Sequence, residues 1–204
     1  MLFVWCKVSF DEKRSHGSAV CETVYFFVEF VCVFPWKCVS LNNQNRGKIM
    51  DGILRKLPIG IQTFEKLREG DYLYVDKTAL VWRIASTETP YFLSRPRRFG
   101  KSLLLSTFEA YFKGQKELFK GLAIEQLEQN WFEYPVLHLD LNAEKYDSKE
   151  RLEKMLEFHL TRWETQYGID KGTMTFSGRF ATIIQQAYEQ NGRRVVVLFD
   201  EYDK

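Results

Sequence analysis

Apolar residues along the chain fall into two alternating patterns: short continuous runs and longer segments with helical spacing. The continuous runs have the length and composition of strands buried on both faces, and they cover 91–93, 135–141 and 194–199. Apolar residues three and four positions apart predict helices, which cover 102–113, 147–167 and 176–190. A glycine follows the end of each helical segment, as is typical of helix ends. The chain therefore alternates between predicted strands and predicted helices.

Weaker patterns precede these segments. Phe64–Arg68 predicts a short helical turn closed by Gly70, and Tyr72–Val75 is rich in strand formers. A helix is expected to follow through about Ala85, with Asp76 as a candidate N-cap, because its side-chain oxygen can accept from free backbone N–H groups. Asp147 and Glu150 have the spacing of a capping box at the start of the long helix.

This order of elements predicts an α/β fold. Strands that alternate with helices form a parallel sheet covered on both faces. The composition is that of an ordinary globular domain, since 45% of the 204 residues are hydrophobic and 27% are charged. A net charge of +2 indicates no general attraction to nucleic acid or membranes.

The first 49 residues differ from the rest, since they contain all four cysteines. Their apolar stretch, residues 24–36, is too short to span a membrane, which takes about 20 residues, and it lacks the pattern of a secretory signal. Globular patterning begins near Met50. We therefore expect residues 1–49 to be a non-native or disordered extension with Met50 as the natural start, and residues 50–204 to form the domain.

The first candidate for chemistry is the loop Arg95–Ser102, which lies between a predicted strand and a predicted helix. Gly100-Lys101-Ser102 matches the end of a P-loop, whose backbone N–H groups and helix dipole bind phosphates. Lys101 is expected to contact the β and γ phosphates and Ser102 to join the Mg²⁺ shell. Arg95 stands where the P-loop pattern has glycine. The residues expected to bind the cofactor are Arg97, Arg98, Phe99, Gly100, Lys101, Ser102 and Leu103.

The second candidate is the acidic end of the last strand. Asp200 and Glu201 follow an apolar run, which is the Walker B pattern. We expect Asp200 to hold Mg²⁺ together with Ser102, and Glu201 to polarise the attacking water while Lys101 assists catalysis. Both motifs lie at carboxyl ends of strands, where parallel sheets bind ligands.

Three lesser candidates are also apparent. Asp140, near the end of its strand, is a weaker site candidate. His138 and His159 lie on apolar faces and are interpreted as core histidines rather than ligands.

These motifs also carry a family resemblance. Leu57–Phe64, Tyr72–Thr78, Phe92–Ser102 and Leu198–Asp203 resemble the bacterial AAA-ATPase-like family, whose P-loop carries arginine in the same way. The resemblance covers about residues 53–204. It implies a P-loop NTPase three-layer sandwich with a parallel sheet, and a cytoplasmic location. It also implies that the ATPase core continues past the Walker B strand, so we expect a truncated domain that folds poorly alone.

Function follows from the motifs and the resemblance together. The chain is expected to bind ATP and Mg²⁺ and to hydrolyse ATP, coupled to an effector domain outside this chain. Family members often carry a PD-(D/E)XK nuclease-like domain, which implies nucleic acid as a partner, and a homo-oligomer is a further expectation. No membrane partner is expected. The alternatives are a nucleotide-gated switch with little turnover, a small-molecule phosphotransferase and an inactive fragment.

Overall fold

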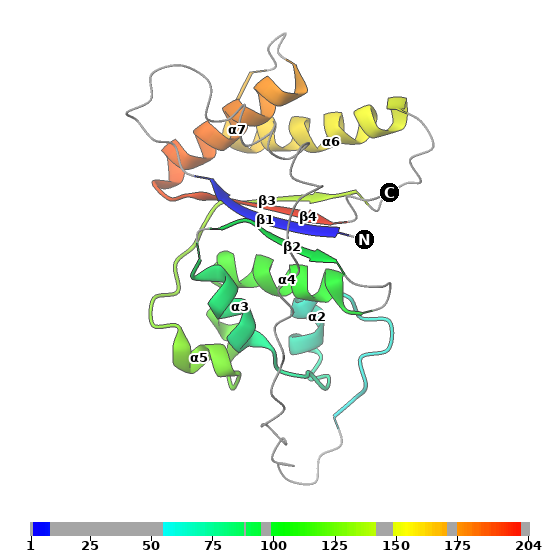
Figure 1. Ribbon diagram of the computed structural model, residues 1–204, viewed down its shortest axis with the longest axis vertical. Helices are drawn as coiled ribbons and strands as arrows, with labels where there is room; N and C mark the ends of the chain where they lie inside the picture. The colour runs from blue at the N-terminus through cyan, green and yellow to red at the C-terminus, as the bar shows by residue number, and fades with distance from the viewer. Residues whose placement is uncertain are drawn as a thin grey trace.

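A computed structural model describes residues 2–8, 55–87, 89–94, 99–141, 149–170 and 175–200. The described strands form one sheet with the order β2-β1-β4-β3 (Figure 1). The strands are β1 (Leu2–Val8), β2 (Tyr91–Ser94), β3 (Val136–Asp140) and β4 (Val195–Asp200). β3 and β4 pair in parallel, whereas β1 is antiparallel to both of its neighbours. It follows that β2, β3 and β4 all run in one direction.

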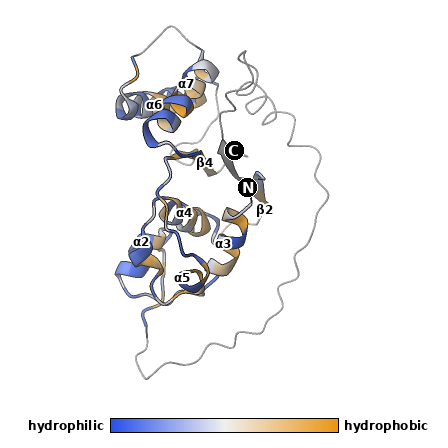
Figure 2. Ribbon diagram, turned by 90° about the vertical axis from the view of Figure 1, so that its left-hand side faces the viewer, coloured by the Kyte–Doolittle hydropathy of each residue, from blue (hydrophilic) through white to orange (hydrophobic). Residues whose placement is uncertain are grey.

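Helices cover both faces of this sheet (Figure 1). One face carries α2 (Phe64–Glu69), α3 (Thr78–Ala85), α4 (Lys101–Phe112), the short 3₁₀ helix η2 (Lys116–Phe119) and α5 (Ala123–Leu127). The other face carries α6 (Lys149–Tyr167) and α7 (Phe176–Asn191). Figure 2 shows the two groups of helices on opposite sides of β4. The predicted α/β fold, with helices on both faces of the sheet, is confirmed, but the sheet is mixed rather than parallel throughout, because β1 is antiparallel to both of its neighbours.

β4 is buried on both faces. Its successive side chains point to opposite sides of the sheet, and helices cover each side. Val196 and Leu198 pack in a core with α4, including Leu105 and Phe108. Val195 and Val197 pack in a second core with α6 and α7. This double burial explains why the sequence of β4 is continuously apolar rather than alternating.

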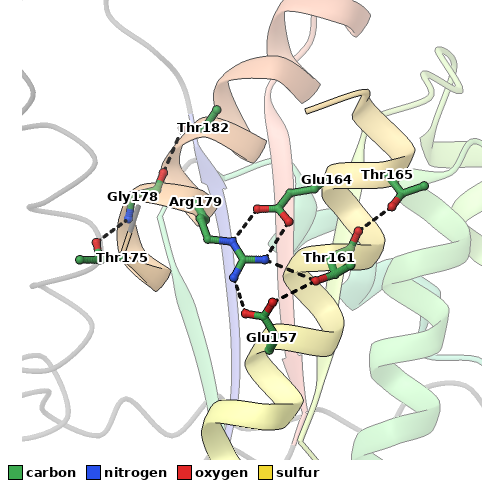
Figure 3. A network of polar contacts seen from close by, with 8 residues as sticks. All are labelled: Glu157, Thr161, Glu164, Thr165, Thr175, Gly178, Arg179 and Thr182. Atoms are coloured by element: carbon green, nitrogen blue, oxygen red, sulfur yellow. Dashed lines mark hydrogen bonds and ion pairs between the residues drawn. The ribbon is translucent and has the colours of Figure 1, made fainter. Parts of the chain in front are cut away.

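Arg179 of α7 connects the two helices of the second core (Figure 3). Its guanidinium donates to both carboxylate oxygens of Glu164 on α6, at 2.6 and 2.7 Å, and it also bonds Glu157. Arg179 and Glu164 are both buried. Hydrogen bonds to Glu164 and then to Glu157 outweigh the effect of burial and raise the pKa of Arg179. Arg179 therefore remains charged inside the core, and its hydrogen bonds join α7 to α6.

Tyr72–Val75 does not form a strand, although it is rich in strand formers. Only Tyr72 makes an isolated bridge, to Lys56, and the following residues are irregular. Leu73 and Val75 are 46% and 71% exposed, whereas Tyr74 packs against the core beside Phe64. Among the described residues no strand pairs with residues 73–75, so nothing extends the single bridge into a ladder. The high strand propensity of Tyr72–Val75 was therefore not sufficient to form a strand there.

Other predictions hold to within a few residues or lie outside the described residues. The strands near Tyr91, Val136 and Val195 and the three long helices are present. Asp76 is not the N-cap of α3, a position that Lys77 occupies, but its Oδ1 accepts from the Thr78 N–H at 2.8 Å at the start of this helix. Asp147 lies outside the described residues. β1, η2 and α5 were not predicted from the sequence, and the domain division at residue 50 stays a prediction.

Candidate functional site

The first turn of α4 begins at a glycine in a left-handed conformation. Gly100 is the N-cap of α4 and has φ 74°, a region that favours glycine. No atom lies within 4 Å of a Cβ built there, so the backbone angle rather than crowding demands glycine. Having no side chain, Gly100 cannot accept from the first N–H groups of α4, which leaves the positive end of a twelve-residue helix as a potential anion site.

The candidate residues around Gly100 differ in exposure. Lys101 is only 7% exposed, although it lies in the first turn of a helix. Ser102 and Leu103 are half-buried, and Phe99 is 62% exposed. A buried lysine at a helix N-terminus is unusual unless it serves a specific partner, because lysine is rarely removed from water. Arg97 and Arg98 lie outside the described residues.

The acidic candidate lies on the same face of the sheet as α4. Asp200 ends β4 and is 7% exposed. It follows Leu198 by two positions, so it belongs to the face of β4 that packs against α4. Gly100, Lys101 and Asp200 are therefore assigned to one side of the sheet. Glu201 lies outside the described residues.

A second carboxylate lies beside Asp200 on the neighbouring strand. Asp140 of β3 is the register partner of Asp200 in the parallel ladder. The Leu141 N–H donates to the Asp200 carbonyl at 3.1 Å, which continues the pairing past the end of β3. Asp140 is exposed where Asp200 is buried. The sequence indicated Asp140 only weakly, because its position beside Asp200 depends on which strands are neighbours.

His138, two residues before Asp140, contacts α4. Its Nδ1 lies 2.8 Å from Oε2 of Glu109, and the Lys113 ammonium donates to Oε1 of the same carboxylate at 2.7 Å. Burial disfavours the charged carboxylate, but the hydrogen bonds from His138 and Lys113 outweigh it and lower the pKa of Glu109 to about 2. This cluster connects α4 to β3. The role of His138 was not anticipated, since the sequence analysis interpreted it only as a core histidine.

His159, the other histidine interpreted as a core residue, is buried as expected, being 7% exposed. It packs beside Trp163 of α6, with ring centroids 5.5 Å apart. Desolvation lowers its pKa. Its Nδ1 has no hydrogen-bond partner among the described residues.

The other side of α4 is held by the segment before it. The Ser106 hydroxyl accepts from the Phe64 N–H at 2.9 Å, so the start of α2 is bonded to the middle of α4. Asp76 Oδ2 accepts from the Ala123 N–H at 2.7 Å and so also caps α5. These contacts give Asp76 a structural role. They join residues more than 40 positions apart, which is why no local sequence signal revealed them.

Magnesium fits this arrangement only if phosphates complete its shell. Among the described residues, no three His, Cys, Asp or Glu side chains are grouped as a metal site would require. Mg²⁺ is commonly held by one or two carboxylates together with phosphates and water. A hydroxyl at Ser102 and a buried carboxylate at Asp200 match that donor set.

A cavity of about 220 Å³ lies elsewhere, near the C-terminal end of α4. Its lining includes Ser86, Tyr111 and Glu128, and the Tyr111 hydroxyl donates to Glu128 at 2.5 Å. None of the predicted site residues that the structure describes lines it. Since Tyr111 is ten residues after Lys101 on the same helix, this cavity and the candidate site are at opposite ends of α4.

The fold and the site define an α/β protein with a helix N-terminus and a buried strand-end carboxylate on one side of its sheet. Residues 58–204 match the AAA-ATPase-like family model, which is described as "Predicted AAA-ATPase". The chain belongs to this family.

A curated relative is also similar. It is the "Uncharacterized protein in vnfD 5'region" of Azotobacter chroococcum mcd 1, 45% identical over 151 residues. The match covers 74% of this chain and 29% of the relative, so this chain spans less than a third of the relative's length. No solved structure matches the chain. No helix within the described ranges combines the length and apolar character needed to cross a membrane.

Proposed function

We propose that this chain binds ATP with Mg²⁺ and hydrolyses the γ-phosphate, and that its fold is a P-loop NTPase sandwich. The observation that carries the proposal is the placement of Gly100 at the α4 N-terminus on the same side of the sheet as buried Asp200. Family membership supports nucleotide use in general. The positive helix end supplies the phosphate site, and the carboxylate supplies the metal site.

The candidate residues then have distinct backbone and side-chain roles. The N–H groups from Phe99 to Leu103 bind phosphate oxygens, and Arg97 and Arg98 add positive charge beside them. Lys101 neutralises the β and γ phosphates, where its low exposure strengthens the electrostatic attraction. Bound Mg²⁺ supplies charge neutralisation on the phosphates. The Ser102 hydroxyl and Asp200 hold the metal ion, and Glu201 orients the attacking water and accepts its proton.

Isothermal titration with ATP and Mg²⁺ tests the binding step. Lys101→Ala is expected to lower ATP affinity by at least about 100-fold, since each 1.4 kcal/mol gives a factor of ten. The matched control is Lys116→Ala, which removes an exposed lysine outside the site. Equal ATP affinity in the two variants would contradict the proposal.

Turnover tests the hydrolytic step. Glu201→Gln is expected to keep ATP binding and to lose most ATP hydrolysis, because the amide cannot accept the proton of the attacking water. Unchanged slow turnover in Glu201→Gln instead indicates a nucleotide-gated switch. Transfer of the γ-phosphate to a small molecule instead of water would indicate a phosphotransferase.

The wider role is proposed from the family and from length. The relative is more than three times longer than the matched region. We propose that ATP hydrolysis drives an effector domain outside this chain. The nuclease-like domain implied by the resemblance makes nucleic acid its target. A cytoplasmic location and self-association belong to the same proposal.

A further inference from the structure

β1 lies between β2, which precedes the loop with Lys101, and β4, which ends at Asp200 (Figure 1). It pairs with β2 from Leu2↔Ser94 to Trp5↔Tyr91. It pairs with β4 from Val4↔Phe199 to Val8↔Val195. β2 and β4 therefore run in the same direction but do not pair with each other.

Within the described residues, β1 is the only strand that pairs with β2, whereas β4 also pairs with β3. β2 is followed in the chain by the P-loop and α4, and β4 ends at Asp200. The backbone ladder of β1 thus connects the part of the sheet that precedes Lys101 to the part that ends at Asp200. Removing β1 would leave unpaired edges on both β2 and β4.

The distance between β2 and β4 depends on the strand β1 that lies between them. Neighbouring strands lie about 4.8 Å apart, so one intervening strand places β2 and β4 about 10 Å apart. A phosphate-binding lysine and a metal-binding carboxylate act together only when their supporting backbones are held at a fixed separation.

We propose that Leu2–Val8 is a positioning strand, which occupies a strand slot between β2 and β4 and sets the spacing of Lys101 and Asp200. The composition of this segment agrees with the role, because Phe, Val and Trp are strong strand formers. The effect on ATP turnover rests on the proposed function, whereas the pairing itself does not.

This proposal and the predicted start at Met50 have opposite consequences. A non-native extension contributes nothing to the site, so changes within Leu2–Val8 would leave it unaffected. A positioning strand makes the site sensitive to the backbone of those residues. An experiment on the full chain separates the two.

A disulfide tests the pairing directly. Cys6 is the register partner of Val197. Cα atoms of opposed antiparallel residues lie about 4.5–5.5 Å apart, within the range that a disulfide spans. In Val197→Cys, mild oxidation of the full chain is expected to join Cys6 to the introduced cysteine within one molecule, as read by peptide mass spectrometry. The double variant Cys6→Ser, Val197→Cys is the control and is expected to lack this linkage.

Three results would overturn the pairing. The first is the absence of any linkage between Cys6 and the introduced cysteine in Val197→Cys. The second is linkage of the introduced cysteine to another cysteine of the chain instead. The third is a linkage found only between two molecules, which would mean that the strand comes from a second copy. None of these readouts requires nucleotide, so they remain informative if the ATPase proposal fails.

A proline tests the effect on the site. Trp5 pairs with both Tyr91 and Leu198, so Trp5→Pro removes an N–H from the centre of the strand. ATP turnover is expected to fall on the order of 100-fold, the loss that a displacement of about 1 Å can cause. Trp5→Val keeps the backbone donor and is expected to keep most of the turnover. Full turnover in Trp5→Pro would overturn the positioning role.

Discussion

Asp140 and Asp200 are register partners at the carboxyl ends of two neighbouring parallel strands, β3 and β4. Parallel pairing places their side chains on the same face of the sheet, and that face packs against α4. Asp200 is buried and Asp140 is exposed. The two carboxylates are therefore adjacent but differ in how strongly water screens them.

This difference predicts unequal effects of neutralisation. Asp200→Asn is expected to abolish most ATP turnover at any Mg²⁺ concentration, because it removes the proposed metal ligand. Asp140→Asn is expected to weaken the apparent Mg²⁺ affinity only severalfold, since an exposed charge acts through water. Turnover measured across a Mg²⁺ titration distinguishes them, because excess Mg²⁺ restores Asp140→Asn and not Asp200→Asn. Equal behaviour of the two variants would show that burial does not separate their roles.

Gly100 supports a second prediction, with Gly121 as its matched control. Both have positive φ, 74° and 76°, and neither has an atom within 4 Å of a built Cβ. Alanine at either position is expected to lower the free energy of unfolding by about 1 kcal/mol, the cost of a left-handed conformation. Only Gly100→Ala is expected to weaken ATP binding as well, by shifting the N–H groups of α4. Urea unfolding and titration calorimetry measure the two effects, and equal ATP affinity in both variants would count against the α4 site.

The Glu109 cluster predicts a pH dependence of stability. The pKa of Glu109 is lowered to about 2 in the folded chain, from an ordinary value of 4.5. Its ionisation therefore stabilises the fold above about pH 5, and this contribution is lost as the pH falls towards 2. Glu109→Gln is expected to flatten the dependence of unfolding free energy on pH in that window. Urea unfolding at several pH values measures it, and identical slopes for the variant and the natural chain would rule out this role.

Arg179 predicts an asymmetric response to mutation. Arg179→Ala leaves the Glu164 carboxylate buried without its main partner and is expected to cost about 3–5 kcal/mol of unfolding free energy. The double variant Arg179→Met, Glu164→Leu removes both charges and is expected to be much closer to neutral. Arg162→Ala, an exposed arginine on the same helix as Glu164, is the control and is expected to change stability by less than about 0.5 kcal/mol. Additive costs in the double variant would show that the pair is not coupled.

The sequence predicted most elements because their patterns are local. β4 has a continuous apolar run, and α4, α6 and α7 have apolar residues at helical spacing. Tyr72–Val75 shows the limit of this reasoning, since its strand formers have no partner beyond one isolated bridge in the described part of the chain. Leu2–Val8 shows the reverse, because its strand depends on two partners about 90 and 190 residues further along the chain.

Local order along the chain thus determined the α/β class, the glycine that starts α4 and the acidic end of β4. Tertiary structure decided which of these come together. It paired Asp140 with Asp200, bonded His138 to Glu109 on α4 and placed β1 between β2 and β4. The physical reason is that helix and strand patterns repeat over a few residues, whereas strand order and register are set by which apolar faces and unpaired backbones meet in the folded chain.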